Sequence, residues 1–412
     1  MHSFITEFRE RGFFYQCTDE SLLSSALQKD KTSSAYIGFD CTAPSLHVGN
    51  LMQLMILRLM QKHGIRPIVL IGGATTKVGD PSGKDKSRQI LSEDQINANI
   101  KGIKANIEKF IKFGDKNTDA ILLDNSAWLD GIKYTEFLGE YGRHFSMNRM
   151  LSFDSVKSRL EREQNLTFLE FNYMILQAYD FLHLNKNYNC VLECGGSDQW
   201  GNIVSGVELT RRVLGNEVFG LTCPLITTAA GAKMGKSENG AVWLGESMLS
   251  PYDYYQFWRN TDDRDVFRFM KIFTDISVQE INEYEKDTQK NINDYKKLLA
   301  FEATKLCHGA KNAQEAADTA KAVFEQGDMA NIATFELDKS LINDGIFVYE
   351  LLKITSLSQS NGEAKRLIRG GGASLNQEKI TDESLKLYKK DFDSSYITLS
   401  IGKKNHIKII LR

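Results

Sequence analysis

A histidine and two lysines that could act on phosphate groups lie in glycine-containing segments far apart in the sequence. His47 begins the segment H-V-G-N, residues 47–50, where a strand is expected to end and a helix to start. Backbone N–H groups in the first helical turn are unpaired, so a histidine beside them suits a phosphate or a developing negative charge. Lys233 and Lys236 belong to K-M-G-K-S, and mobile lysines can follow phosphate charge during a reaction. Taken alone, a histidine at a helix start is also common on protein surfaces.

A glycine-rich loop with two further cations follows an expected strand. It reads G-G-A-T-T-K-V-G-D-P-S-G-K over residues 72–84, and it carries Lys84 and, four residues later, Arg88. Gly79 and Gly83 enclose three residues where a Walker A loop needs four, so this is not a Walker A motif. The sequence also lacks G-x-G-x-x-G, the fingerprint of a dinucleotide-binding fold.

Three polar residues share one face of an otherwise apolar helix. Tyr173, Gln177 and Asp180 stand at i, i+4 and i+7 in N-Y-M-I-L-Q-A-Y-D, and this spacing places them on the same side. Two interpretations stay open: a polar stripe on the surface, or a buried face whose side chains bind a ligand. A second polar segment, C-G-G-S-D-Q-W-G-N, follows a strand and can present Asp198 and Gln199 to a ribose.

Strands that alternate with helices position these segments. We expect a parallel sheet with helices on both faces, and ligands at the carboxyl ends of its strands. A helix that begins at a Ser92–Gln95 capping box is expected to run to about Phe113. Residues from Ser250 to about Gln326 have a purely helical pattern, and late strand-like runs follow. The expected strands of the sheet span residues 34–40, 66–72, 119–124 and 189–193, and the helix that follows the first of them spans 47–63.

Composition excludes several classes of protein. The chain has 412 residues, 42% of them hydrophobic, and a net charge of −2, so it is neither disordered nor globally basic. It contains no apolar run of the roughly 18 residues that a membrane span needs. The first eleven residues are charged and lack an apolar core, which argues against a secretory signal and predicts a cytosolic protein. The six cysteines lack C-x-x-C spacing and are expected to be ordinary thiols.

The C-terminal tail differs in charge from the rest of the chain. Residues 361–412 contain 11 Lys and Arg against 6 Asp and Glu, a net charge of +5. Two explanations of this imbalance are equally good: an ordinary solvated surface, or a small basic RNA-binding module attached to an acidic body. Three cations, Lys365, Arg366 and Arg369, fall within about one helical turn just before a glycine run, where they could contact an RNA backbone.

Taken together, the segments resemble a known family. H-V-G-N and K-M-G-K-S resemble the two signature motifs of class I aminoacyl-tRNA synthetases, HIGH and KMSKS, with Asn50 and Gly235 as the departures. The surrounding segments G-F-D-C-T-A-P-S-L-H-V-G-N, V-G-D-P-S-G-K, N-Y-M-I-L-Q-A-Y-D and G-G-S-D-Q-W-G-N are similar to those of bacterial tyrosyl-tRNA synthetases. The resemblance implies activation of L-tyrosine by ATP to tyrosyl-adenylate and pyrophosphate, followed by transfer to the 3′-terminal adenosine of tRNA(Tyr).

The resemblance also implies roles for individual residues, with Tyr36 and Asp180 at the phenol hydroxyl and Asp80, Tyr173 and Gln177 at the α-ammonium. The implied tyrosine-binding set is Tyr36, Asp80, Tyr173, Gln177, Asp180 and Gln199. The implied ATP- and adenylate-binding set is Gly38, Asp40, Thr42, His47, Gly49, Asn50, Gly196, Asp198 and Lys236. The residues implied in catalysis on the phosphates are His47, Asn50, Lys84, Arg88, Lys233, Lys236 and Ser237.

The implied architecture has three parts. A Rossmann-like doubly wound parallel sheet with a dimerisation insertion spans residues 1–245, an α-helical domain 246–328, and a small α+β RNA-binding domain 341–412, with a linker at 329–340. Mg²⁺ is expected on the phosphates of ATP rather than in a protein site. A homodimer is implied, with part of its surface in residues 145–171. Two alternatives remain: a tryptophanyl-tRNA synthetase, and an idle relative of these enzymes that only binds RNA.

Overall fold

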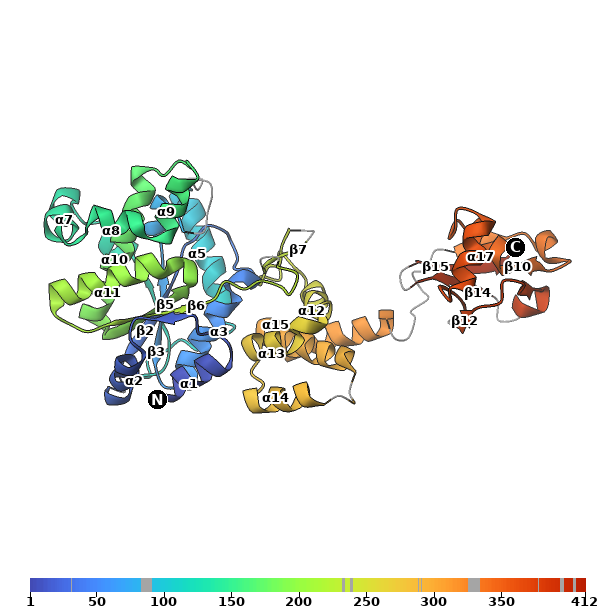
Figure 1. Cartoon of the computed structure of the whole chain (residues 1–412), viewed down its shortest axis with the longest axis horizontal. Coiled ribbons are helices and arrows are strands. Elements are labelled where there is room, and N and C mark those ends of the chain that lie inside the picture. The colour runs from blue at the N-terminus through green and yellow to red at the C-terminus, as the bar shows by residue number, and fades with distance from the viewer. Residues whose placement is uncertain are drawn as a thin grey trace. The chain divides into compact units, whose positions relative to one another are not determined.

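The computed structural model divides the chain into two compact units, Met1–Ala320 and Lys321–Arg412. Figure 1 traces both units along the chain. The residues that the structure describes are 1–30, 32–82, 91–231, 234–237, 240–287, 289, 291–324, 334–376, 378–392, 396–402 and 405–412. Among them, no helix is both long and apolar enough to cross a membrane.

A six-stranded sheet forms the centre of the first unit. Its strands lie in the order β1-β6-β5-β2-β3-β4, and all neighbours are parallel except β1, which pairs antiparallel with β6. The chain moves outward from β2 through β3 to β4 and then returns to β5, so the direction of winding reverses between β2 and β5. This confirms the expected Rossmann-like doubly wound sheet. The strands are β1 Gln16–Cys17, β2 Ser34–Phe39, β3 Arg66–Ile71, β4 Ile121–Asp124, β5 Cys190–Gly196 and β6 Phe219–Cys223.

Helices cover both faces of this sheet, and α10 and α11 lie side by side over β5 and β6 (Figure 1). The capping box at Ser92 is confirmed, but α5 ends at Ile107 rather than near Phe113. Phe113 instead forms an isolated bridge with Ala120, because the chain has to turn back toward β4. The helices are α1 Ser3–Glu10, α2 Glu20–Lys29, α3 Val48–Lys62, α4 Thr75–Val78, α5 Glu93–Ile107, α6 Ser126–Leu129, α7 Tyr134–Glu140, η1 Gly142–His144, α8 Met147–Ser152, α9 Asp154–Glu161, α10 Phe168–Tyr188, η2 Ser197–Gln199 and α11 Trp200–Leu214.

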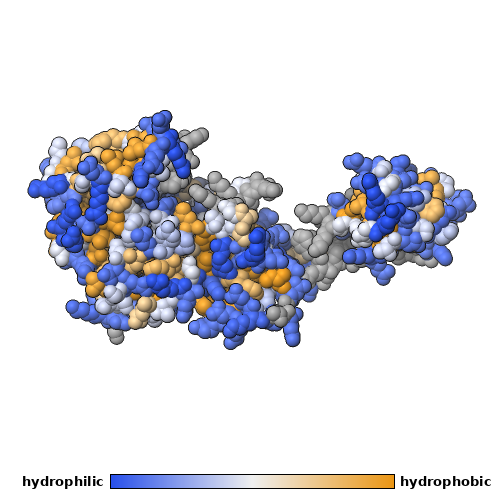
Figure 2. Space-filling view, viewed as in Figure 1, coloured by the Kyte–Doolittle hydropathy of each residue, from blue (hydrophilic) through white to orange (hydrophobic). Residues whose placement is uncertain are grey.

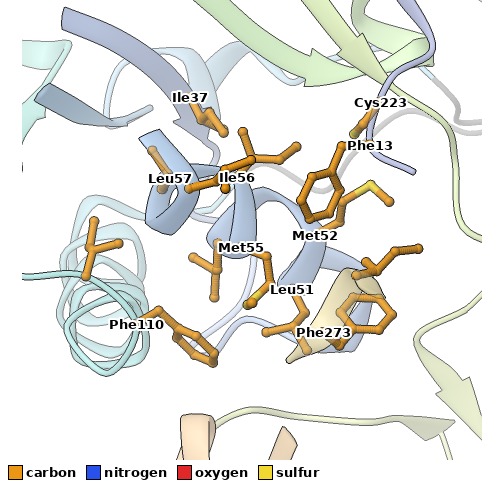
Figure 3. Packing of buried hydrophobic residues seen from close by; sticks show 14 of the residues in the cluster. Phe13, Ile37, Leu51, Met52, Met55, Ile56, Leu57, Phe110, Cys223 and Phe273 are labelled. Atoms are coloured by element: carbon orange, nitrogen blue, oxygen red, sulfur yellow. The ribbon is translucent and has the colours of Figure 1, made fainter. Parts of the chain in front are cut away.

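The helical segment that follows shares its core with the sheet. Figure 3 shows Ile37 of β2 and Leu51 of α3 in the same packed cluster as Phe273. Because these side chains form one buried cluster, no break in the core marks the expected boundary at 245/246, and the three-domain division stays a prediction. The elements are the short strands β7 Lys236–Ser237 and β8 Gly240–Ala241, then α12 Pro251–Arg259, η3 Asp263–Asp265, α13 Val266–Phe273, α14 Val278–Lys286 and α15 Ile292–Phe324, which is broken at Gly309.

The second unit has its own core, centred on Leu351, Ile368 and Leu399. Its five-stranded sheet has the order β12-β11-β14-β15-β9, and β9 pairs parallel with β15. The interval 329–340, predicted as a linker, therefore contains a strand of this sheet. The elements are β9 Thr334–Leu337, η5 Lys339–Ile342, β10 Ile346–Phe347, α16 Val348–Ile354, α17 Asn361–Arg369, β11 Ala373–Leu375, β12 Glu378–Ile380, β13 Lys386–Leu387, η6 Lys389–Phe392, β14 Ile397–Ile401 and β15 Asn405–Leu411.

Candidate active site

The predicted site residues gather at the carboxyl ends of β2 and β5, the two neighbouring strands between which the winding reverses. Asp40 directly follows β2, and Gly196 ends β5. Connections leave such a pair of strands in opposite directions, so a crevice that can hold a ligand opens between them. Asp198 and Gln199 lie in the short helix η2 that continues β5.

A buried carboxylate forms the deepest part of the site. Asp180 of α10 is only 2% exposed, and it accepts hydrogen bonds from Nδ2 of Asn125 (2.9 Å) and Nε1 of Trp128 (2.7 Å). Tyr36 of β2 is equally buried, and its hydroxyl has no hydrogen-bond partner among the described residues. A buried hydroxyl without a partner costs free energy, so this position favours a polar ligand.

Glu193 of β5 is a second buried carboxyl, and it lies opposite Tyr36 in the register of β2 and β5. Its Oε1 accepts a hydrogen bond from Gln177, whereas its Oε2 has no partner in the described part of the chain. Burial raises the pKa of Tyr36 well above its ordinary value, and the charges of Glu193 and Asp180 raise it further. Tyr36 and Glu193 thus interact electrostatically without a well-formed hydrogen bond.

Burial also raises the pKa values of the two buried carboxyls, Asp180 and Glu193. Loss of hydration raises the pKa of Asp180 to about 7, although the hydrogen bonds from Asn125 and Trp128 act in the opposite direction. Burial likewise raises the pKa of Glu193 to about 7, against the effects of its bond from Gln177 and of its interaction with the Tyr36 hydroxyl. A carboxyl that titrates near neutrality beside an unpartnered hydroxyl can exchange hydrogen bonds with a phenol-sized ligand.

The polar face of α10 is confirmed as a buried face, and the surface-stripe alternative is wrong. The Tyr173 hydroxyl lies 3.2 Å from both carboxylate oxygens of Asp40, and Tyr173 is 7% exposed. Gln177 and Asp180 follow on the same face and make the contacts given above. One helix therefore supplies polar groups that reach Asp40, Glu193 and Asn125.

Hydrogen bonds between side-chain amides link Gln177 of α10 to Asp80 in the loop after α4. Nε2 of Gln199 donates to Oδ2 of Asp80 (2.8 Å), and Oδ1 of Asp80 accepts from the backbone N–H of Ser82. Nδ2 of Asn202 lies within hydrogen-bond distance of both Gln177 (3.0 Å) and Gln199 (3.2 Å). Asp80, Gln177 and Gln199 are thus brought together as predicted.

The H-V-G-N segment forms the N-terminus of α3. His47 is the N-cap residue rather than part of the first turn, and its Nδ1 accepts from the backbone N–H of Gly49 (3.0 Å). Because Nδ1 accepts, the proton of the neutral ring is on Nε2. Oδ1 of Asn50 accepts from the backbone N–H of His47, which completes a capping box. Both side chains therefore shape the helix start that a phosphate would approach.

The K-M-G-K-S backbone lies directly against this turn. Gly235 has φ of +111°, and a Cβ there would lie 3.0 Å from the Gly49 nitrogen. A side chain at Gly49 would approach the Met234 carbonyl oxygen to 3.3 Å. Gly235 therefore allows a close approach that serine would strain. Lys84, Arg88, Lys233 and the side chains of Lys236 and Ser237 lie outside the described residues, so their predicted roles stay predictions.

Three hydrogen bonds hold the base of the lysine loop, which spans residues 227–244 and includes K-M-G-K-S. Buried Asp265 accepts from the backbone N–H of Ala229 (2.7 Å), and Nη2 of Arg268 donates to the Thr227 carbonyl. On the returning limb, the backbone N–H of Leu244 donates to the Leu46 carbonyl (2.9 Å), just before His47. The loop thus connects α13 with the start of α3.

The remaining predicted nucleotide residues lie at or just after the carboxyl ends of β2 and β5. A Cβ on Gly38 would meet open space, and Thr42 is exposed. A Cβ on Gly196 would come within 2.6 Å of Asp198 Oδ1 and 3.3 Å of Leu225 Cδ2. Leu225 is half exposed beside this glycine and offers an apolar surface to a flat ring.

Sequence reasoning missed four residues that the structure places in the site: Asn125, Trp128, Glu193 and Asn202. Glu193 carried a signal, because it is a single charge within a buried apolar strand. Asn202 stood in a motif that we singled out, but nothing in its spacing gave it a partner. Asn125 and Trp128 follow β4 and reach Asp180 only through the tertiary fold.

The predicted RNA-binding cations lie on α17 of the second unit. The Lys365 ammonium lies 4.3 Å from the centre of the Tyr349 ring, a cation–π contact. Arg369 pairs with Glu383 at 2.8 Å, and Arg366 is exposed. The three cations therefore project from one short helix, as their spacing predicted.

Comparisons with known proteins identify the family of this chain. Residues 28–325 match the family of class I tRNA synthetases for tryptophan and tyrosine. The chain is 54% identical over 409 residues to a tyrosine–tRNA ligase of Rickettsia bellii, covering 99% of both chains. It is also 54% identical over 412 residues to one of Pelagibacter ubique, covering both in full. The crystal structure of a C-terminally truncated mitochondrial tyrosyl-tRNA synthetase of Aspergillus nidulans matches 79% of this chain and 95% of its own, with a TM-score of 0.70 and 29% identity.

The fold and the family match cover most of the chain and include the whole candidate site. The chain therefore belongs to the class I tRNA synthetase family of tryptophan and tyrosine enzymes. It is 54% identical over essentially its whole length to tyrosine–tRNA ligases, and its activity is therefore tyrosine–tRNA ligation.

Proposed function

We propose that the crevice between β2 and β5 carries out both steps of tyrosine–tRNA ligation, with the phenol of tyrosine bound at its buried end. The Asp180 carboxylate would accept from the phenol hydroxyl, and the Tyr36 hydroxyl, which has no partner among the described residues, would bond to the same oxygen. This arrangement is the single observation that carries the assignment to tyrosine. It also argues against tryptophan, because an indole has no hydroxyl for Tyr36 and Asp180 to bind.

The other end of the amino acid would meet the polar network. Asp80, Tyr173 and Gln177 offer oxygen atoms to the substrate ammonium, and they come from a loop and one helix face. Gln199 lies between Asp80 and Asn202, where the substrate carboxylate would pass toward the nucleotide. Adenylation is attack of that carboxylate on the α-phosphorus of ATP, which releases pyrophosphate and needs no covalent intermediate with the enzyme. Positioning by these groups and stabilisation of the phosphate charge can supply the acceleration.

ATP is the second substrate, and we place it along the α3 N-terminus. His47, Gly49 and Asn50 form the turn on which its phosphates would lie, and Asp198 and Asp40 would face the ribose. Lys233 and Lys236 would hold the leaving pyrophosphate. We propose that Mg²⁺ enters on the ATP phosphates, because it prefers to keep several water ligands. Among the described residues, no group of three or more His, Cys, Asp or Glu side chains could hold a metal ion.

Exchange of labelled pyrophosphate into ATP tests this assignment. The purified protein should catalyse the exchange with L-tyrosine and not with tryptophan or phenylalanine. Equal exchange with tryptophan would indicate the tryptophan branch of the family. No exchange with any amino acid, together with intact tRNA binding, would indicate an idle RNA-binding relative.

We further infer that the second unit binds tRNA(Tyr) and that charging takes place in the cytoplasm, where tRNA is used. The supporting observations are the net charge of +5 over residues 361–412 and the cluster of Lys365, Arg366 and Arg369 on α17. Cations on one short helix can contact successive phosphates of an RNA backbone.

A homodimer is supported by an apolar surface on the first unit. Large hydrophobic side chains are exposed between α7 and the start of α10, and Figure 2 shows hydrophobic residues gathered over these helices. Exposed patches of this kind mark interaction sites. The interval 145–171, which we expected to form part of a dimer surface, contains most of them. The exposed residues are Tyr134, Met147, Leu151, Leu160, Phe168 and Leu169. Measurement of the molar mass in solution tests the proposal.

A further inference from the structure

Asn202 is a buried polar residue of α11 with no role in the assignments above. Only 2% of it is exposed, although it lies at the end of the G-G-S-D-Q-W-G-N segment. Its Nδ2 group lies 3.0 Å from Oε1 of Gln177 and 3.2 Å from Oε1 of Gln199. One amide nitrogen of Asn202 therefore serves two glutamines that come from different elements.

The hydrogen bonds around Asn202 form one continuous chain across five side chains. Each glutamine accepts from Asn202 through its oxygen and donates through its nitrogen to a carboxyl group. Gln177 donates to Glu193 and Gln199 donates to Asp80, both at 2.8 Å. Asn202 is thus the only donor at the centre of this chain, and the two carboxyls are the acceptors at its ends.

The direction of every bond follows from the Asp80 end. Oδ1 of Asp80 already accepts from the backbone N–H of Ser82, and its Oδ2 faces Gln199. A carboxylate can only accept, so Gln199 must turn its nitrogen toward Asp80 and its oxygen toward Asn202. Asn202 must then present its nitrogen, and the same nitrogen meets the oxygen of Gln177.

Reversal of any one amide would place like atoms together. If the Asn202 amide were turned over, its oxygen would face the oxygens of both glutamines. If the Gln177 amide were turned over, its NH₂ group would face the NH₂ group of Asn202 and would leave Glu193 without a donor on Oε1. Buried polar groups left without partners in this way are costly, which holds the chain in a single arrangement.

We propose that Asn202 is a positioning residue for tyrosine recognition: it fixes the Gln177 carbonyl oxygen toward the substrate ammonium. The proposal rests on the proposed role of Gln177. A carbonyl oxygen has two lone pairs, and Asn202 uses one of them, so the second can accept from an ammonium group. Without Asn202 the Gln177 amide can turn, and its NH₂ group then repels the ammonium.

Binding of three ligands to Asn202→Asp tests the proposal. Aspartate has the shape of asparagine; when ionised it cannot donate, and when protonated it can donate to only one glutamine. The ligands are L-tyrosine, tyramine, which lacks the carboxylate, and 4-ethylphenol, which lacks both the carboxylate and the ammonium and is therefore insensitive to the charge of the new aspartate. We expect at least tenfold weaker binding of L-tyrosine and tyramine, and less than threefold change for the ligand without an ammonium.

Asn185→Asp is the matched control. Asn185 lies on α10, and its Nδ2 donates to the backbone carbonyl of Cys190, so the same kind of bond is lost away from the crevice. The control should leave the relative affinities for the three ligands unchanged. Equal weakening of all three ligands by Asn202→Asp, or no change in any, would overturn the proposal. Absence of tyrosine binding by the unaltered protein would instead contradict the proposed function.

A second pair of variants decides the matter if Asn202→Asp does not fold. Glu193→Gln keeps an oxygen that accepts from Gln177, whereas Glu193→Leu removes it. We expect Glu193→Leu to lose affinity for the two ammonium ligands selectively, and Glu193→Gln to restore it to within threefold of the unaltered protein. Equal behaviour of the two variants would show that the acceptor at the end of the chain does not orient Gln177.

Discussion

The indole Nε1 of Trp128 donates to Oδ1 of Asp180 at 2.7 Å, and this bond links the turn after β4 to the buried end of the crevice. It holds the carboxylate that we assign to the phenol of tyrosine. Since Asn125 holds the other oxygen, both donors together fix the direction in which the remaining lone pairs of Asp180 point.

Trp128→Phe should reduce the preference for tyrosine over phenylalanine. The change removes one hydrogen bond to a carboxylate, and such bonds contribute about 1.5–3 kcal/mol. The ratio of kcat/KM for the two amino acids in pyrophosphate exchange measures this. Trp258→Phe, in the core formed with α13, is the control and should leave the ratio unchanged. An unchanged ratio in Trp128→Phe would mean that Asp180 is not oriented by the indole.

Tyr36→Phe should lower selectivity without lowering stability. The hydroxyl makes no well-formed hydrogen bond among the described residues, only a weaker interaction with Glu193, so its removal should cost the free protein little. With tyrosine bound, however, one hydrogen bond is lost, which should reduce discrimination against phenylalanine by about 0.5–1.5 kcal/mol. Asp180→Asn should reduce it further, because a charged acceptor bonds more strongly. Thermal unfolding and kcat/KM ratios test both parts, and a marked fall in Tm for Tyr36→Phe would contradict the first.

Stability should fall as the pH rises between about 4 and 7. Burial raises the pKa of Asp180 and of Glu193 to about 7, whereas in the unfolded chain both groups release their protons near pH 4. The folded state therefore binds more protons in this interval, and the free energy of unfolding decreases by up to roughly 1.4 kcal/mol per pH unit per group. Denaturant unfolding of Asp180→Asn at several pH values should show a smaller decrease than the unaltered protein. The same dependence on pH in the variant and the unaltered protein would show that folding does not raise the pKa of Asp180.

Lys233→Ala and Lys236→Ala should slow adenylate formation and leave tyrosine affinity nearly unchanged. Their charge is expected to meet the phosphates mainly as the transition state forms, so its loss acts on the rate rather than on substrate binding. Single-turnover adenylation and equilibrium tyrosine binding separate the two effects. Lys311→Ala, an exposed lysine of α15, is the control. Loss of tyrosine affinity with an unchanged single-turnover rate would contradict the prediction.

A chain that ends at Ala320 should fold, form tyrosyl-adenylate and charge tRNA poorly. The first unit ends at this residue, whereas β9 already belongs to the sheet of the second unit. Loss of phosphate contacts should also flatten the salt dependence of tRNA binding, by somewhat under one unit of slope per contact. Pyrophosphate exchange and aminoacylation, measured on both lengths over a range of salt, test this. Equal aminoacylation by the two would show that the second unit is not the RNA-binding part.

Local patterns predicted the parts of the site that depend on one element. The spacing of Tyr173, Gln177 and Asp180 placed them on one helix face because the helical repeat is fixed by the backbone. The capping box at Ser92 and the strand expected over residues 34–40, observed at Ser34–Phe39, are local in the same sense. Each required only a few neighbouring residues and was confirmed.

Partners that come from distant elements could not be predicted in this way. Trp128 meets Asp180 only because β4 and α10 are brought together by the winding of the sheet. β9 was assigned to a linker because its partner β15 lies at the other end of the second unit, and parallel pairing leaves no turn signal between them. The hydrogen-bond partners of Asn202, Gln177 and Gln199, are apparent only in the folded structure.

The attachment of the lysine loop at two points has a mechanical consequence. One limb is bonded to Asp265, which directly precedes α13, and to Arg268 within α13. The other limb is bonded to Leu46, just before α3. The two limbs are also joined to each other, because the backbone N–H of Val242 donates to the Gly235 carbonyl (3.1 Å) and β7 pairs antiparallel with β8. A change in the seating of α13 against α3 would therefore act on a hairpin braced at both limbs, which makes the helices after Ser250 part of the support of the loop.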